Sequence, residues 1–217
     1  MALTTIFGIN GVGKDTVANE LRIKNTDISV TSMSRVLMYI LDITKTYDVS
    51  EKVCEDQYKK LESVPQSKMI EIENTDYKKI LCEISKSDQN VLMLSHLISA
   101  LRHGEQINYL TDRLTPDWYV DANTALIQLV APFNVISERR KNDQTRNRNI
   151  DISEIEYHQS LCTNEWERIK RVKPEAINKM FIVENVDLSK ATSDIENIMK
   201  NKVKILKLDG GDSKWEI

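Results

Sequence analysis

Five short runs of apolar and β-branched residues recur along the chain and are typical of buried strands. These runs cover residues 2–7, 28–32, 90–95, 125–131 and 180–184. Between them, apolar positions recur at the three- and four-residue spacing of helices. This spacing predicts helices over residues 16–24, 35–43 and 189–200, another starting at Pro132, and two within 51–87 that Pro65 separates. Strands that alternate with helices predict an α/β domain whose mainly parallel five-stranded sheet carries helices on both faces.

Two further segments complete the expected layout. Residues 203–208 alternate in a way that favours an edge strand, and residues 104–121 are mixed, which indicates a loop with one short helix. Neither an internal repeat nor a low-complexity linker interrupts the 217 residues, of which 41% are hydrophobic. We therefore expect a single domain over residues 1–217.

Charge and cysteine content exclude several protein classes. The net charge of −3 gives no global reason to expect nucleic acid or an anionic membrane as a partner. Cys54, Cys82 and Cys162 lie far apart without a C-x-x-C spacing, which argues against a disulfide framework and a zinc site. With no apolar stretch near 18 residues, we expect a soluble cytoplasmic protein, and homo-oligomerisation stays open.

The segment that reads GINGVGKDT holds three of the six glycines and lies between an expected strand and an expected helix. Glycines let successive backbone N–H groups point into one concavity, at which the positive end of the following helix is also aimed. This context predicts a polyphosphate site rather than a turn that binds nothing. The expected contacts to ATP are Gly8, Ile9, Asn10, Gly11, Val12, Gly13, Lys14, Asp15 and Thr16.

The residue after the lysine narrows the class. Many nucleotide triphosphatases have Ser or Thr there as a ligand of Mg²⁺, whereas this chain has Asp15, followed by Thr16. The pattern G-x-x-G-x-G-K-x-T resembles that of nucleoside monophosphate kinases. This resemblance implies that Mg²⁺ is held mainly by substrate phosphates and water, so we assign no side chain to a metal. The carboxylate of Asp15 is expected to face away from the phosphates.

A second informative segment reads RRKNDQTRNR over residues 139–148. Its five basic residues and one acidic residue give a local charge of +4 in an acidic chain. Arginine side chains match phosphoryl oxygens in a bidentate way and remain charged. Beside the glycine-rich segment, this composition favours a catalytic lid, while a solvated basic face and an RNA-binding patch are the alternatives.

Together the two segments resemble adenylate kinases of the archaeal type, whose lid carries a similar R-R-x-N-D-x-T-R-N-R string. The resemblance implies the P-loop kinase fold, with a mobile lid at about 139–151 and a monophosphate-binding region at about 33–85. It also implies the transfer of the γ-phosphoryl group from Mg-ATP to a nucleoside monophosphate. Lys14 would bridge the phosphates, Arg146 and Arg148 would clamp the transferring group, and Arg139 or Arg140 would lie against adenine.

The chain departs from this family pattern on the metal and acceptor sides. The family has Asp-Thr-His at the end of the third strand, where this chain has Leu94-Ser95-His96. In the acceptor region, Glu55 and Lys59 replace two arginines. Arg35 and Lys59 are the expected anion contacts for the acceptor, and His96 is a third candidate or a scaffold residue.

The leading hypothesis is therefore an ATP-dependent nucleoside monophosphate kinase, most similar to adenylate kinase. A kinase of another (deoxy)nucleotide or of a different small acceptor is the nearest alternative. The missing strand-end acid also leaves open a nucleotide-binding regulatory module without efficient transfer. RNA binding by the basic segment is disfavoured by the acidic remainder of the chain.

Overall fold

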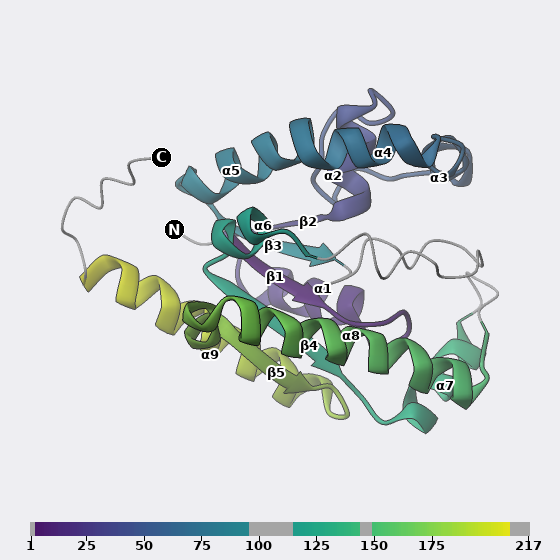
Figure 1. Ribbon diagram of the computed structural model, residues 1–217. Coiled ribbons are helices and arrows are strands. Elements are labelled where there is room, and N and C mark those ends of the chain that lie inside the picture. The colour runs from purple at the N-terminus through teal and green to yellow at the C-terminus, as the bar shows by residue number, and fades with distance from the viewer. Residues whose placement is uncertain (1–2, 96–114, 144–148, 209–217) are drawn as a thin grey trace.

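The sheet of the computed structural model, which describes residues 3–95, 115–143 and 149–208, has five parallel strands (Figure 1). The strands are β1 (Leu3–Phe7), β2 (Ile28–Ser32), β3 (Asn90–Ser95), β4 (Ala125–Val130) and β5 (Met180–Glu184). Their order across the sheet is β2-β3-β1-β4-β5, and every neighbouring pair is parallel. Because all strands point the same way, the loops that follow them meet at one edge of the sheet.

Helices cover both faces of this sheet (Figure 1). They are α1 (Lys14–Lys24), α2 (Met33–Ile40), α3 (Glu55–Glu62), α4 (Gln66–Ile72), α5 (Lys78–Lys86), α6 (Asp117–Ala122), α7 (Phe133–Asn142), α8 (Ile152–Val172) and α9 (Leu188–Leu208). A π-helical turn, η1 (Glu73–Tyr77), joins α4 to α5, and a 3₁₀ turn, η2 (Pro174–Lys179), precedes β5. The predicted α/β fold class is confirmed.

Alternate residues of the central strand β1 face two separate apolar clusters. Leu3 and Phe7 join a cluster with residues of α2, α5 and α8, in which the rings of Phe7 and Trp166 meet edge to face at 5.7 Å. Ile6 joins the other cluster, with residues of α1 and α9. This two-sided burial explains why the strand is apolar or β-branched at every position, as expected of a parallel sheet between helical layers.

Most predicted elements are confirmed, with small shifts at their ends. The structure has all five strands, α3 and α4 lie on either side of Pro65, and a short helix, α6, lies within residues 104–121. Helix α2 ends at Ile40 rather than residue 43, because Asp42 adopts a left-handed conformation with φ of 54°. That residue redirects the chain, and the N–H of Ile43 bonds back to the carbonyl of Met38.

The predicted edge strand over residues 203–208 is wrong, since these residues continue α9 to Leu208. No glycine or proline interrupts the sequence between Leu188 and Leu208. Once a helix is nucleated, each added residue gains a hydrogen bond at little further cost, so the helix extends over residues whose side chains also suit a strand.

The three cysteines form no disulfide, as predicted, and Cys162 is buried while Cys54 is exposed. Burial raises the pKa of the Cys162 thiol to about 11. Among the described residues, no helix combines the length and the apolar character that crossing a membrane requires.

Candidate active site

The glycine-rich loop, residues 8–13, lies between the end of β1 and the start of α1, at the carboxyl edge of the sheet. Its three glycines have positive φ values, 88° at Gly11 and 97° at Gly13 among them. Other residues rarely adopt these angles, so the turn requires glycine. The loop carries out the local turn that its sequence predicts.

Backbone N–H groups of this loop are available for a ligand. Within the described part of the chain, the N–H groups of Gly11 and Gly13 donate no hydrogen bond. Gly13 is also the N-cap of α1, whose first turn leaves further N–H groups without partners inside the helix. Unpaired amides at a helix N-terminus attract anions, and Asp15 and Thr16 are exposed in that first turn.

Lys14 lies beneath the loop instead of extending into solvent. The residue is 9% exposed, and its Nζ donates to the carbonyls of Gly8 at 2.6 Å and Ile9 at 3.2 Å. These bonds hold a full positive charge beside the unpaired amides. The arrangement fits a polyphosphate, because amides and an ammonium group are the partners that phosphate oxygens accept.

Two consecutive arginines at the end of α7 contact the loop from another side. Arg139 donates through Nη1 to the carbonyl of Val12 at 3.0 Å, and Arg140 donates through Nε to the carbonyl of Asn10 at 2.9 Å. Asn185, directly after β5, also donates to the carbonyl of Val12, at 2.8 Å. Both guanidinium groups are therefore engaged with the loop, and their predicted contact with adenine stays a prediction.

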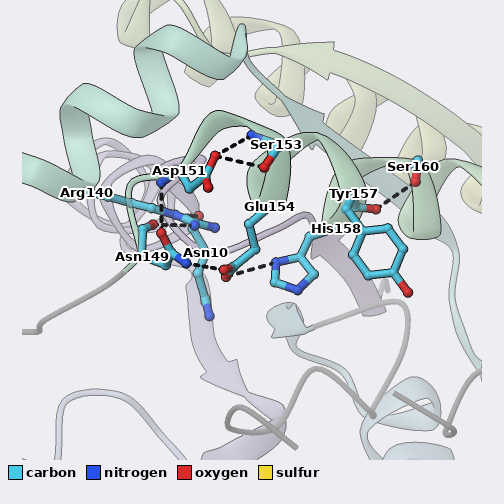
Figure 2. Close-up of polar contacts among 9 residues, drawn as sticks. All are labelled: Asn10, Arg140, Asn149, Asp151, Ser153, Glu154, Tyr157, His158 and Ser160. Carbon is cyan, nitrogen blue, oxygen red and sulfur yellow. Dashed lines mark hydrogen bonds and ion pairs between the residues drawn. The ribbon is translucent and has the colours of Figure 1, made fainter. Parts of the chain in front are cut away.

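Arg140 also begins a polar chain that leads to helix α8 (Figure 2). Its Nη1 donates to the carbonyl of Asn149 at 2.8 Å, and the side-chain amide of Asn149 donates to Glu154. Glu154 in turn lies 4.0 Å from Nδ1 of His158. Asp151 caps α8 by accepting from Ser153, whose hydroxyl and N–H lower the pKa of that carboxyl. The residues after the basic segment are thus tied to the glycine-rich loop.

The environment of His158 leads to a prediction about pH. Partial burial lowers the pKa of His158, as does the charge of Arg140, whereas Glu154 opposes the shift. The unfolded chain therefore binds a proton below pH about 6.5, where the folded protein still resists it. We expect the free energy of unfolding to fall as the pH decreases from about 6.5 toward the lower folded pKa. Urea denaturation at pH 7.5, 6.5 and 5.5 measures this, and His158→Gln should show a weaker decrease over that range.

On the acceptor side, the structure separates the two predicted anion contacts. Arg35, on α2 just after β2, is 8% exposed, and its Nη1 has no hydrogen-bond partner. A buried, unpaired guanidinium is costly unless a ligand or water pairs with it. Lys59, by contrast, is 63% exposed in its side chain and pairs with Glu55 at 3.0 Å. Arg35 is therefore the better placed of the two for an anion.

The end of β3 carries no acid, as its sequence indicates. Leu94 and Ser95 are both buried there, and the hydroxyl of Ser95 lies 3.9 Å from the sulfur of Met33. The described residues contain no cluster of three or more His, Cys, Asp or Glu side chains that suits a metal ion. This donor set does not fit a metal held by protein carboxylates, so Mg²⁺ would have to arrive with its nucleotide.

Three predicted site residues, His96, Arg146 and Arg148, lie outside the described residues. Conversely, sequence reasoning missed Asn185 and Asn149, which bond to the loop and to Arg140. Asn185 directly follows a predicted strand, and residues at that position of a parallel sheet gather at the carboxyl edge. This topological rule was the signal that could have identified it.

No protein-family model matches the chain, and the curated proteins contain no match. Three solved structures align with it along most of its length. A gluconokinase from Sinorhizobium meliloti 1021 has 12% identity, a TM-score of 0.48 and coverage of 97% of this chain and 98% of its own. A shikimate kinase from Aquifex aeolicus vf5 has 15% identity, a TM-score of 0.49 and coverage of 93% and 98%. A thymidylate kinase from Candida albicans has 14%, 0.48, and 93% and 92%. Likeness at this level says nothing about the substrate of this chain.

Proposed function

We propose that this chain is an ATP-dependent phosphotransferase that moves the γ-phosphoryl group of Mg-ATP to a nucleoside monophosphate, in the manner of an adenylate kinase. One observation carries the proposal. Lys14 is held 2.6 Å from the carbonyl of Gly8, beside two loop amides that have no partner in the described structure. Fixed positive charge and open amides at a helix N-terminus are what a transferring phosphate requires.

On the donor side, the loop amides and Lys14 would hold the nucleotide phosphates. The ammonium group of Lys14 would offset the negative charge that develops as the phosphoryl group leaves ADP. Mg²⁺ would enter as part of the Mg-ATP substrate, bound by phosphates and water. The acceptor phosphate is already an anionic nucleophile, so alignment and charge neutralisation are sufficient, and no side-chain base is needed.

Arg35 would bind the acceptor phosphate. It follows β2, while the loop follows β1, and β3 lies between these two strands. Two strand spacings place the chain ends on the order of 10 Å apart, a separation that two phosphate groups can span. Arg146 and Arg148 would close over the transferring group, as their resemblance to the lid of adenylate kinases implies, and this role stays a prediction.

We expect Arg35→Gln to raise the KM of the acceptor about tenfold or more, with the KM of ATP little changed. The variant loses one charge-assisted hydrogen-bond partner of the acceptor and none of the donor. Steady-state kinetics with each substrate varied in turn measures both constants. Arg35→Lys, which keeps the charge, should recover part of the loss. An unchanged acceptor KM would remove Arg35 from the site, and Lys59→Gln then tests the other predicted contact.

A second candidate function is a nucleotide-binding regulatory module without efficient transfer. The observation that favours it is Leu94, which is buried at the strand end where the family pattern has an acid. A kinase of another small acceptor is the third candidate, because the base-binding side of the acceptor site has no identified residue. Cytoplasmic location and the absence of nucleic-acid and membrane partners stay predictions.

A substrate panel tests these candidates. The protein is incubated with Mg-ATP and each common ribo- and deoxyribonucleoside monophosphate, then with shikimate and gluconate, and ADP formation is measured. The proposal expects diphosphate formation from at least one monophosphate and inhibition by diadenosine pentaphosphate, which occupies both sites at once. ATP binding without product from any acceptor would favour the regulatory module. Product from a non-nucleotide acceptor alone would favour the third candidate.

A further inference from the structure

The carbonyl groups of the glycine-rich loop are held from outside by residues of two other elements. The carbonyl of Val12 accepts from Nη1 of Arg139 at 3.0 Å and from Nδ2 of Asn185 at 2.8 Å. The carbonyl of Asn10 accepts from Nε of Arg140 at 2.9 Å (Figure 2). A loop that is expected to bind an anion through its N–H groups thus has two of its carbonyls fixed by long-range donors.

Peptide geometry links these carbonyls to the N–H groups that have no partner. In a trans peptide, the C=O of one residue and the N–H of the next lie in one plane and point in opposite directions. The carbonyl of Asn10 therefore sets the direction of the N–H of Gly11, and the carbonyl of Val12 sets that of Gly13. These are the two loop amides that donate no hydrogen bond within the described residues.

The same two glycines are where the outer residues pack most closely. A Cβ on Gly11 would lie 2.9 Å from Cγ of Arg140, and a Cβ on Gly13 would lie 2.5 Å from Nδ2 of Asn185. The side chains thus lie directly against the residues whose amides they orient. Any larger residue at either position would displace them.

The outer residues are themselves held in place. Nη2 of Arg139 donates to the carbonyl of Asn185 at 2.8 Å, and the N–H of Asn185 donates to the carbonyl of Val130, at the end of β4. Arg140 is 6% exposed, and its Nη1 donates to the carbonyl of Asn149. Each donor has a second anchor on a different element, so its position relative to the sheet is fixed before any ligand binds.

We propose that Arg139, Arg140 and Asn185 are positioning residues that orient the amides of Gly11 and Gly13 toward the phosphates, rather than residues that contact the nucleotide base. The inference rests on the proposed phosphate-binding role of the loop. Arg140 sets the peptide between Asn10 and Gly11, while Arg139 and Asn185 set the peptide between Val12 and Gly13. The expected ligand contact of this part of the site is therefore the polyphosphate alone.

Binding of ATP and of inorganic tripolyphosphate separates the two roles, because tripolyphosphate has no base. We expect Arg139→Lys and Arg140→Lys each to weaken binding of both ligands about tenfold and by similar factors, as measured by titration calorimetry. Arg171→Lys is the matched control, since it makes the same change at an exposed position of α8. A loss confined to ATP would assign the arginine to the base and overturn the proposal, as would no loss for either ligand.

The amide spectrum of the protein without ligand provides the second measurement. Arg140→Lys should shift the amide resonance of Gly11 most, whereas Arg139→Lys and Asn185→Ala should shift that of Gly13 most. A general loss of structure would instead move resonances throughout the chain, and thermal unfolding of each variant reports it. Asn185→Ala keeps the backbone bond to Val130, so it tests Gly13 even where an arginine variant folds poorly. Unshifted glycine amides in all three variants would overturn the proposal.

The two measurements also separate this inference from the proposed function. If the unaltered protein binds neither ATP nor tripolyphosphate, the proposed function fails, while the amide spectrum still decides whether these residues orient the loop. If it binds both ligands and the variants bind equally well, the orienting role alone fails.

Discussion

Lys14→Met lowers the rate of ATP-dependent phosphoryl transfer by about 100-fold or more. The change keeps a long side chain but removes a preorganised charge from the transition state, a loss of about 2.7–4 kcal/mol in comparable sites. It also leaves the carbonyls of Gly8 and Ile9 without their Nζ donor, which loosens the loop. Initial rates at saturating ATP with the acceptor found in the substrate panel measure the effect.

A control for this prediction lies on the same helix. Lys24 is at the other end of α1 and pairs with Glu20 on the surface at 3.4 Å. Lys24→Met removes the same charge from the same element, so the rate should stay close to that of the unaltered protein. Turnover of Lys14→Met within about twofold of normal would contradict the assignment of Lys14.

Gly13→Ala should weaken ATP binding by about 30-fold or more and lower turnover with it. Two costs add at this position. The backbone has φ of 97°, where a residue with a Cβ loses about 1–2 kcal/mol, and the new methyl group would lie 2.5 Å from Nδ2 of Asn185. Displacing that amide breaks its bond to Val12, at a cost of about 1–3 kcal/mol.

A double variant apportions the two costs. Asn185→Ala removes the side chain that the new methyl group meets but leaves the backbone angle unchanged. Gly13→Ala in that background should therefore weaken ATP binding less than it does alone, and the difference measures the steric part. Equal effects in both backgrounds would show that contact with Asn185 is unimportant. Thermal unfolding of each variant distinguishes a local change in the loop from loss of the fold.

The glycine-rich loop was predictable because its signals are local. A strand, a turn that only glycines can make and a helix follow one another within residues 3–24, so each is determined by its neighbours in the chain. The same holds for the five strands and for the break at Pro65. The prediction of a strand over 203–208 used equally local evidence and was wrong, because the preceding turns of α9 favour continued helix over a new strand.

The surroundings of the loop were not predictable in this way. Arg139 was expected to bind the nucleotide with its neighbour Arg140, since a run of basic residues shows charge but not direction. In the structure both arginines reach carbonyls that lie more than 120 positions earlier in the chain. Arg35 and Lys59 were equal candidates for the acceptor phosphate, and only packing shows that one is buried and the other paired at the surface.

By itself, the sequence determined the α/β class, the strand positions and the loop that ends in Lys14, since hydrophobic periodicity and glycine geometry act over a few neighbouring residues. The tertiary structure alone decided the strand order and the meeting of α7, Asn185 and the loop at one sheet edge. The physical reason is that hydrogen bonds such as that between Asn185 and Val12, 173 residues apart, depend on how packed layers bring distant segments together.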